Sequence, residues 1–167
     1  MNAFIDLAKY FIVEDNSNPW SGTSLEGYYK LNPRAKGLFG EKVVENILND
    51  IYHWNIEPAD NSKNLGYDCK INGVKTEIKF STALEKNEKW KCKINHIGFE
   101  KDWDQIICAC VNGDGNMRIV MFSKDNFPKE LLSHQQGGKT SKNDDYTVDK
   151  QNSYKFLFHD NAAVLVE

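Results

Sequence analysis

Residues 66–81 read GYDCKINGVKTEIKFS, and this stretch decides the expected fold. Asn72-Gly73 is the two-residue turn that favours a type I′ β-hairpin, so two antiparallel strands are predicted on either side of it. Counting outward from the turn, the hairpin pairs each residue of one strand with one of the other, and alternation divides the side chains between two faces. The apolar face holds Tyr67, Cys69, Ile71, Val74, Thr76, Ile78 and Phe80, and the charged face holds Asp68, Lys70, Lys75, Glu77 and Lys79.

The charged face brings two carboxylates together, because the register places Asp68 opposite Glu77. Directly opposed side chains have Cβ atoms about 5 Å apart, where like charges repel, and a bound divalent cation would explain the arrangement. Lys79 lies on the same face and could contact a phosphate or position an attacking water. These groups suit metal-assisted hydrolysis of a phosphodiester. The alternative is a surface hairpin whose charges form ordinary ion pairs.

With Asp68, the run Glu77-Ile78-Lys79 nine positions later and an upstream helical Glu41, the chain resembles the PD-(D/E)XK nuclease superfamily, the fold of many type II restriction endonucleases. The resemblance covers about residues 36–111. It implies an α/β fold with a restriction-endonuclease-like core, in which helices flank a mixed central β-sheet. It further implies that Asp68 and Glu77 bind Mg²⁺, with Mn²⁺ able to substitute, that Lys79 assists the attack and that Glu41 completes the site. The chain departs from the family motif at Tyr67, where the motif has proline.

The function that this resemblance implies is Mg²⁺-dependent, sequence-specific cleavage of double-stranded DNA. Cutting both strands favours a homodimer with two active sites, although a monomer that nicks one strand at a time is compatible with the size. A host carrying such an enzyme needs a DNA methyltransferase for protection. Two alternatives remain: a repair nuclease or junction resolvase on the same core, and a non-catalytic binding or interaction module that kept the scaffold.

The remaining elements follow from periodicity and from turn residues. A helix is predicted from Pro33 to about residue 52, capped by Asn32, with Glu41 at the flank of its apolar side and Glu45 pointing further towards solvent. That apolar side consists of Val43, Val44, Ile47 and Ile51. Other predictions are helices at 2–12 and 124–132, strands at 91–97, 105–111, 118–122 and 154–158, and loops at 14–32, 57–65 and 133–150. The strand at 105–111 (QIICACV) is expected to be buried on both faces.

Positive charge gathers around the hairpin although the whole chain carries a net charge of −3. Residues 63–101 contain nine lysines and five acidic residues, which suits a polyanion approaching one face and equally suits a solvated surface cluster. His96 is read as a structural histidine facing apolar neighbours in preference to a general base. Candidate DNA-binding residues are Lys70, Lys75, Lys91, Lys93, Asn95 and His96, with Gln135, Gln136 and Lys139 in the loop at 133–150.

The bulk composition fits one domain spanning residues 1–167. No apolar run reaches the length of a transmembrane helix, and the first residues make a poor signal peptide, so no membrane association is expected. The four cysteines show no zinc-site spacing and are interpreted as buried, reduced thiols of a cytoplasmic protein.

Overall fold

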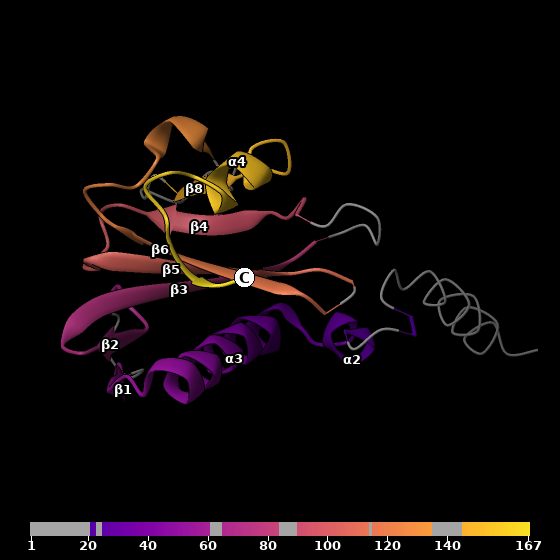
Figure 1. Ribbon diagram of the computed structural model, residues 1–167, viewed down its shortest axis with the longest axis horizontal. Helices are drawn as coiled ribbons and strands as arrows, with labels where there is room; N and C mark the ends of the chain where they lie inside the picture. Colours follow the sequence, from indigo (N-terminus) through magenta and orange to yellow (C-terminus); the bar gives the residue numbers. More distant parts are fainter. Residues whose placement is uncertain (1–20, 23–24, 61–64, 84–89, 114, 135–144) are drawn as a thin grey trace, which may run out of the picture.

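A six-stranded sheet forms the centre of the molecule, in the strand order β1-β2-β3-β5-β6-β9 (Figure 1). The computed structural model describes residues 21–22, 25–60, 65–83, 90–113, 115–134 and 145–167. Strands β3 and β5 are parallel, and the other neighbours within this sheet are antiparallel, so the predicted mixed α/β architecture is confirmed. The strands are β1 (Ile56–Pro58), β2 (Cys69–Ile71), β3 (Val74–Thr82), β5 (Gln105–Val111), β6 (Met117–Ser123) and β9 (Ala163–Val166).

Two further layers cover the faces of this sheet (Figure 1). Helix α3 (Pro33–Tyr52) lies on one face, preceded by the short α2 (Glu26–Tyr29). A three-stranded sheet in the order β4-β8-β7 lies on the other face, together with α4. These elements are β4 (Ile94–Gly98), β7 (Ser133–His134), β8 (Asp145–Val148), the 3₁₀ turn η2 (Lys129–Leu131) and α4 (Ser153–Leu157).

The hairpin has the predicted register and turn. Cys69 pairs with Thr76 and Ile71 with Val74, while Asn72 and Gly73 take positive φ angles of 50° and 85°. Positive φ at both central residues is the conformation that a type I′ turn requires. The predicted β2–β3 hairpin is therefore confirmed over residues 69–76.

Strand β5 is buried on both faces, as predicted for a central strand. Ile107 and Ala109 join a core cluster with Val44 and Leu48 of α3. Ile106, Cys108 and Cys110 join a second cluster on the opposite face, where the β4 and α4 side chains pack. The sheet thus separates two cores and fixes α3 and β4 on opposite sides of β3.

Helix α3 begins as predicted, because Asn32 Oδ1 accepts a hydrogen bond from Ala35 N at 2.9 Å and Pro33 occupies the first turn. Val44 is buried and Ile47 packs against the core, as predicted, but Gly40 and Leu48 are buried too, and Ile51 is 52% exposed. The reason is a close approach to β3. A Cβ at Gly40 would lie 2.3 Å from Phe80 Cβ, so the helix turns its glycine towards the sheet.

Several predicted elements near the C-terminus are wrong. The strand predicted at 154–158 is replaced by helix α4 (Ser153–Leu157), because Phe156 and Leu157 both enter the core. Asp149 Oδ1 accepts from Asn152 N at 3.1 Å in the turn that precedes the helix. The helix predicted at 124–132 is reduced to η2, since Pro128 directly precedes the turn and Phe127 is anchored in the core. The final strand, β9, was missed.

Smaller differences concern the predicted loops. The loop at 14–32 contains α2, the loop at 57–65 begins within β1, and the loop at 133–150 contains β7 and β8. The strand predicted at 91–97 is β4 at Ile94–Gly98. The helix predicted at 2–12 lies outside the described residues. All four cysteines are buried free thiols, as expected. No helix in the described ranges is long and apolar enough to cross a membrane.

Candidate active site

The candidate site begins where β2 separates from β3. Strand β2 pairs with only the first three residues of β3, and their ladder ends at Cys69 opposite Thr76. Asp68 follows directly outside this ladder: its N–H donates to Thr76 O at 3.0 Å, and its carboxylate Oδ2 accepts from Ile78 N at 2.7 Å. Asp68 was predicted to pair directly with Glu77 across the hairpin. Its carboxylate instead accepts a hydrogen bond from the backbone of Ile78 at the edge of β3.

The Asp68 carboxylate is in an unfavourable place for a negative charge. Burial raises its pKa, and the neighbouring charge of Glu77 raises it further. The hydrogen bond from Ile78 N–H and the positive charge of Lys79 act in the opposite direction without cancelling the effect. A carboxylate with a raised pKa beside a second carboxylate is the electrostatic situation that a bound cation relieves.

Glu77 lies on β3 and is only 4% exposed. Its Oε1 lies 2.5 Å from Lys79 Nζ and 3.2 Å from Lys101 Nζ. A buried carboxylate needs such partners, because an unpaired buried charge is strongly destabilising. Lys101 comes from the β4–β5 connection, and nothing in the hairpin sequence indicates it, so it is a site residue that sequence reasoning missed.

Glu41 reaches the site from α3. Burial, and then the charge of Asp68, raise the pKa of Glu41 to about 7. The helical glutamate therefore lies within electrostatic reach of the hairpin carboxylates. Glu45 was expected to point to solvent, but its side chain is 12% exposed and pairs with Lys42 at 2.5 Å.

A cavity of about 350 Å³ runs along the open edge of β3, between α3 on one side and β4 on the other. Glu41, Asp68 and Lys79 border it, so three of the four predicted catalytic side chains share one space. Glu77 contacts this group through Lys79. The rest of the lining consists of Tyr28, Pro33, Lys36, Gly37, Ile78, Phe80, Lys93, Ile94, Asn95 and His96.

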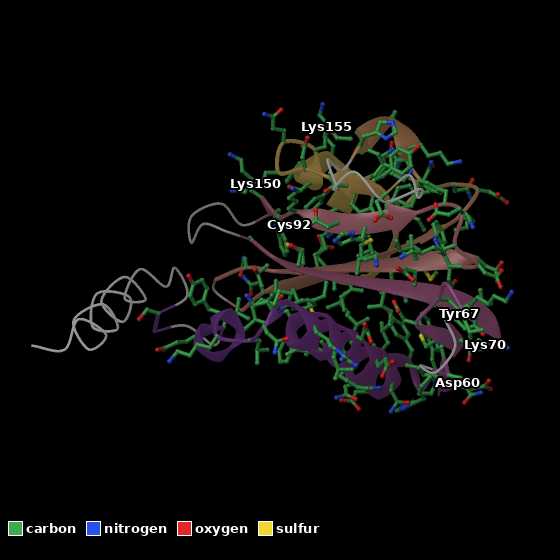
Figure 2. The ribbon with its side chains drawn as sticks, turned by 180° about the vertical axis from the view of Figure 1, so that it is seen from behind. Asp60, Tyr67, Lys70, Cys92, Lys150 and Lys155 are labelled. Carbon is green, nitrogen blue, oxygen red and sulfur yellow. The ribbon has the colours of Figure 1, made fainter. Side chains whose placement is uncertain are left out.

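The predicted DNA-binding residues separate into two groups. Lys93, Asn95 and His96 line the cavity, whereas Lys91 is exposed just before β4. Lys75 pairs with Asp102 at 2.7 Å. Lys70 borders a different hollow, whose lining includes Tyr67 and Asp60. Figure 2 shows these three side chains together at the β1–β2 end of the molecule. Gln135, Gln136 and Lys139 lie outside the described residues.

His96 was expected to face apolar neighbours, and this prediction is wrong. Its side chain is 63% exposed, and its Nδ1 lies 3.2 Å from Asp145 Oδ2. The backbone at His96 has a φ of 58°, which breaks the alternation on which the prediction depended. Lys36 was also not predicted as a site residue. Its ammonium lies 5.4 Å from the ring centre of Tyr28 on α2, and the Tyr28 ring centre lies 5.8 Å from that of Phe80.

The donor chemistry of the site fits a hard divalent cation. Asp68, Glu77 and Glu41 offer only carboxylate oxygens, which are the ligands that Mg²⁺ prefers, and two of the three have raised pKa values. In the described part of the chain, no three histidine, cysteine, aspartate or glutamate side chains are already arranged to hold a metal ion together. The Glu77 carboxylate contacts Lys79 and Lys101.

Comparison with known proteins does not extend the resemblance. No protein-family model matches the chain, and a search of curated proteins finds no match.

Proposed function

We propose that this protein is a Mg²⁺-dependent endonuclease that hydrolyses phosphodiester bonds of double-stranded DNA, on a restriction-endonuclease-like core of the PD-(D/E)XK type. The observation that carries the proposal is the meeting of Asp68, Glu41 and Lys79 at one cavity on the open edge of β3, with Glu77 held against Lys79. Burial raises the pKa of Asp68 and of Glu41, so a bound cation would relieve the cost of keeping their carboxylates charged.

In this proposal Asp68 and Glu77 would hold the metal, and Glu41 would complete the site. Mg²⁺ would supply charge neutralisation at the phosphate and a more acidic water. Lys79 would contribute a positive charge that contacts the reacting phosphate or orients the attacking water. Lys101 would keep a positive charge beside the Glu77 carboxylate, at 3.2 Å, when Lys79 turns towards the substrate.

DNA is the preferred polyanion because the cavity has a donor-rich side. Lys93, Asn95 and His96 border it from β4, and Lys36 borders it from α3. Cationic and amide donors of this kind are those that bind the phosphates of a nucleic-acid strand. The positive balance of residues 63–101 within an acidic chain agrees with one face that meets DNA.

The restriction-type assignment adds three expectations. The enzyme would act in the cytoplasm, where its four free thiols stay reduced. It would cut both strands as a homodimer, with a monomer that nicks each strand in turn as the alternative. A DNA methyltransferase would protect the host DNA.

The experiment is digestion of unmethylated plasmid and phage DNA with the purified protein, in Mg²⁺ and in EDTA. We expect discrete fragments in Mg²⁺, slower or altered cutting in Mn²⁺ and intact DNA in EDTA. Lys79→Ala should lose cleavage, whereas Lys155→Ala, an exposed lysine on α4 far from the hairpin (Figure 2), should retain it.

Each alternative has its own outcome in this experiment. Preferential cutting of four-way junctions over linear duplex would favour a resolvase. Non-specific nicking of damaged DNA would favour a repair nuclease. Binding of DNA without cleavage under all metal conditions would leave a non-catalytic module. Intact DNA together with no DNA binding would contradict the proposal altogether.

A further inference from the structure

Strand β4 is irregular at the point where it borders the cavity. Its pairing with β8 joins Ile94 to Val148 and Ile97 to Tyr146. Between these pairs β4 therefore has two residues, Asn95 and His96, where β8 has one, Thr147. This is the count of a β-bulge, and bulges re-aim side chains at functional edges.

The bulge changes which side chains reach the cavity. In a regular strand, neighbouring residues point to opposite faces, so one of Asn95 and His96 would point into the core. At the bulge both border the cavity, while Ile94 and Ile97 on either side remain in the core. His96 obtains this position with a φ of 58°, an uncommon conformation for a residue other than glycine. Such backbone persists where the surroundings hold it in place, and it gathers at functional sites.

Two side chains of β8 hold the bulge. The Thr147 hydroxyl, which is buried, lies 2.9 Å from Asn95 Oδ1 and 3.0 Å from Ile94 O. The Asp145 carboxylate lies 3.2 Å from His96 Nδ1. The Asp145 carboxylate fixes the orientation of the His96 ring through its Nδ1. The hydrogen bond from Thr147 to Asn95 Oδ1 leaves the amide nitrogen of Asn95 as the donor for a ligand.

The start of β4 is also fixed to the rest of the site. Ser81 Oγ, on β3, donates to Lys93 O at 2.8 Å. Strand β3 carries Glu77 and Lys79, so the bulge is held at a set distance from the proposed catalytic residues. A loosely attached strand could not serve in this way, because binding groups must be placed within fractions of an ångström.

We infer that the β4 bulge is the DNA-positioning element of this protein: Asn95 and His96 contact the sugar-phosphate backbone beside the phosphate to be cleaved, and Asp145 and Thr147 are positioning residues that act only through them. The inference rests on the proposed function and assigns the part of the substrate that the β4 side of the cavity recognises. Contacts to the sugar-phosphate backbone fix the position of a protein on the duplex without reading the base sequence, so the bulge would bind DNA of any sequence.

The test is a double-mutant cycle on DNA affinity. The probe is a fluorescein-labelled 20-base-pair duplex, titrated with the full-length protein in Ca²⁺ in place of Mg²⁺ and followed by fluorescence anisotropy. His96→Asn keeps a residue that tolerates positive φ and removes the ring. We expect it to weaken binding about tenfold, and Asp145→Asn to weaken it about fivefold, as for loss of one backbone contact. The double variant should be no weaker than His96→Asn alone, because Asp145 acts through His96.

Thr147 provides an independent arm. Thr147→Val removes the hydroxyl with little change in volume and should weaken DNA binding. Thr147→Ser keeps the hydroxyl and should bind DNA with the affinity of the wild type. In Mg²⁺ the weakened variants should raise KM and leave kcat within about twofold, since they alter binding in the ground state and in the transition state alike. Thermal unfolding of every variant checks that the fold is retained.

Four results would overturn the inference. Wild-type affinity in His96→Asn would show that the bulge does not contact DNA. Additive losses in the double variant, or equal losses in Thr147→Val and Thr147→Ser, would show that β8 only supports the fold. If the wild-type protein itself neither binds nor cleaves DNA, both this inference and the proposed function fail; if it cleaves DNA and His96→Asn binds normally, only the inference fails.

Discussion

The two sides of the cavity are built on different physical principles. The α3–β3 side carries the carboxylates, and it is rigid because it is packed: Gly40 of α3 lies directly against Phe80, and Glu77 is buried among lysines. The β4 side carries Lys93, Asn95 and His96, and it is held by side-chain hydrogen bonds from β8.

This difference suggests a division of labour within the site. Buried carboxylates with raised pKa values suit catalysis, because a proton or a bound cation neutralises their unfavourable negative charge. Accessible donors on a bulge suit substrate binding, because a ligand that enters the cavity reaches them directly. Changes on the first side should therefore alter catalysis and the pH dependence of stability, and changes on the second should alter affinity for DNA.

The largest effect is expected at Asp68. Asp68→Asn keeps an oxygen that can accept from Ile78 N but removes the charge that would bind metal. We expect cleavage to fall at least about 100-fold, as for loss of a principal electrostatic group, and Mn²⁺ affinity by calorimetry to fall at least about tenfold. The melting temperature should not fall, because the carboxylate is destabilised by burial and by Glu77. Unchanged cleavage would remove Asp68 from the site.

Close packing of the α3–β3 side is tested at Gly40. Gly40→Ala would place a Cβ 2.3 Å from Phe80 Cβ, so we expect a loss of about 2–3 kcal/mol in the free energy of unfolding, or roughly 5–10 °C in melting temperature. The matched control is Gly37→Ala in the same helix, where an added Cβ meets nothing within 4 Å; it should stabilise the fold by roughly 0.5–1 kcal/mol. Equal effects at the two positions would contradict the close approach.

Glu41 should make stability depend on pH. Because its pKa is raised from 4.5 to about 7 in the folded protein, the folded state holds the proton more tightly, and stability falls as pH rises from about 4.5 to about 7. Glu41→Gln removes this penalty. The variant should be more stable than wild type at pH 8 by on the order of 1 kcal/mol, since the group is half exposed, and equal to it below pH 4.5.

The measurement for Glu41 is urea unfolding at pH 4.5 and at pH 8. Glu100→Gln, at an exposed glutamate, is the matched control for replacing a glutamate with glutamine. A constant difference at both pH values would show that the carboxyl group of Glu41 is not under electrostatic strain.

The smallest effect is expected at Lys75, which pairs with Asp102 and does not border the cavity. Lys75→Ala should change DNA affinity less than about twofold, whereas Lys93→Ala, on the cavity, should weaken it about threefold to tenfold. Fluorescence anisotropy at two salt concentrations measures both. A larger loss at Lys75 than at Lys93 would place the DNA on the β2 side of the molecule.

Local sequence determined some elements correctly. The Asn72-Gly73 turn sets its register without help from the rest of the fold, and Asn32-Pro33 starts α3 from neighbouring residues alone. The run at β5 is apolar at nearly every position, so it could only be a buried strand. These features brought Asp68, Glu77 and Lys79 into one prediction.

Other features depend on partners that are distant in the chain. Lys101 contacts a glutamate 24 residues earlier, and the His96 ring contacts Asp145, 49 residues later. The buried side of α3 is set by Phe80, and α4 is helical because Phe156 and Leu157 both enter the core. The periodicity of a single segment contains none of this information, so the β4 bulge and the role of Lys101 could be identified only from the structure.

The central claim is tested most directly by single-turnover cleavage of plasmid DNA in Mg²⁺, with enzyme in excess, by wild type, Lys79→Ala and Lys155→Ala. The account predicts that Lys79→Ala loses at least about 100-fold in rate while keeping its affinity for DNA, and that Lys155→Ala cleaves at the wild-type rate. Equal cleavage rates for wild type and Lys79→Ala would contradict it.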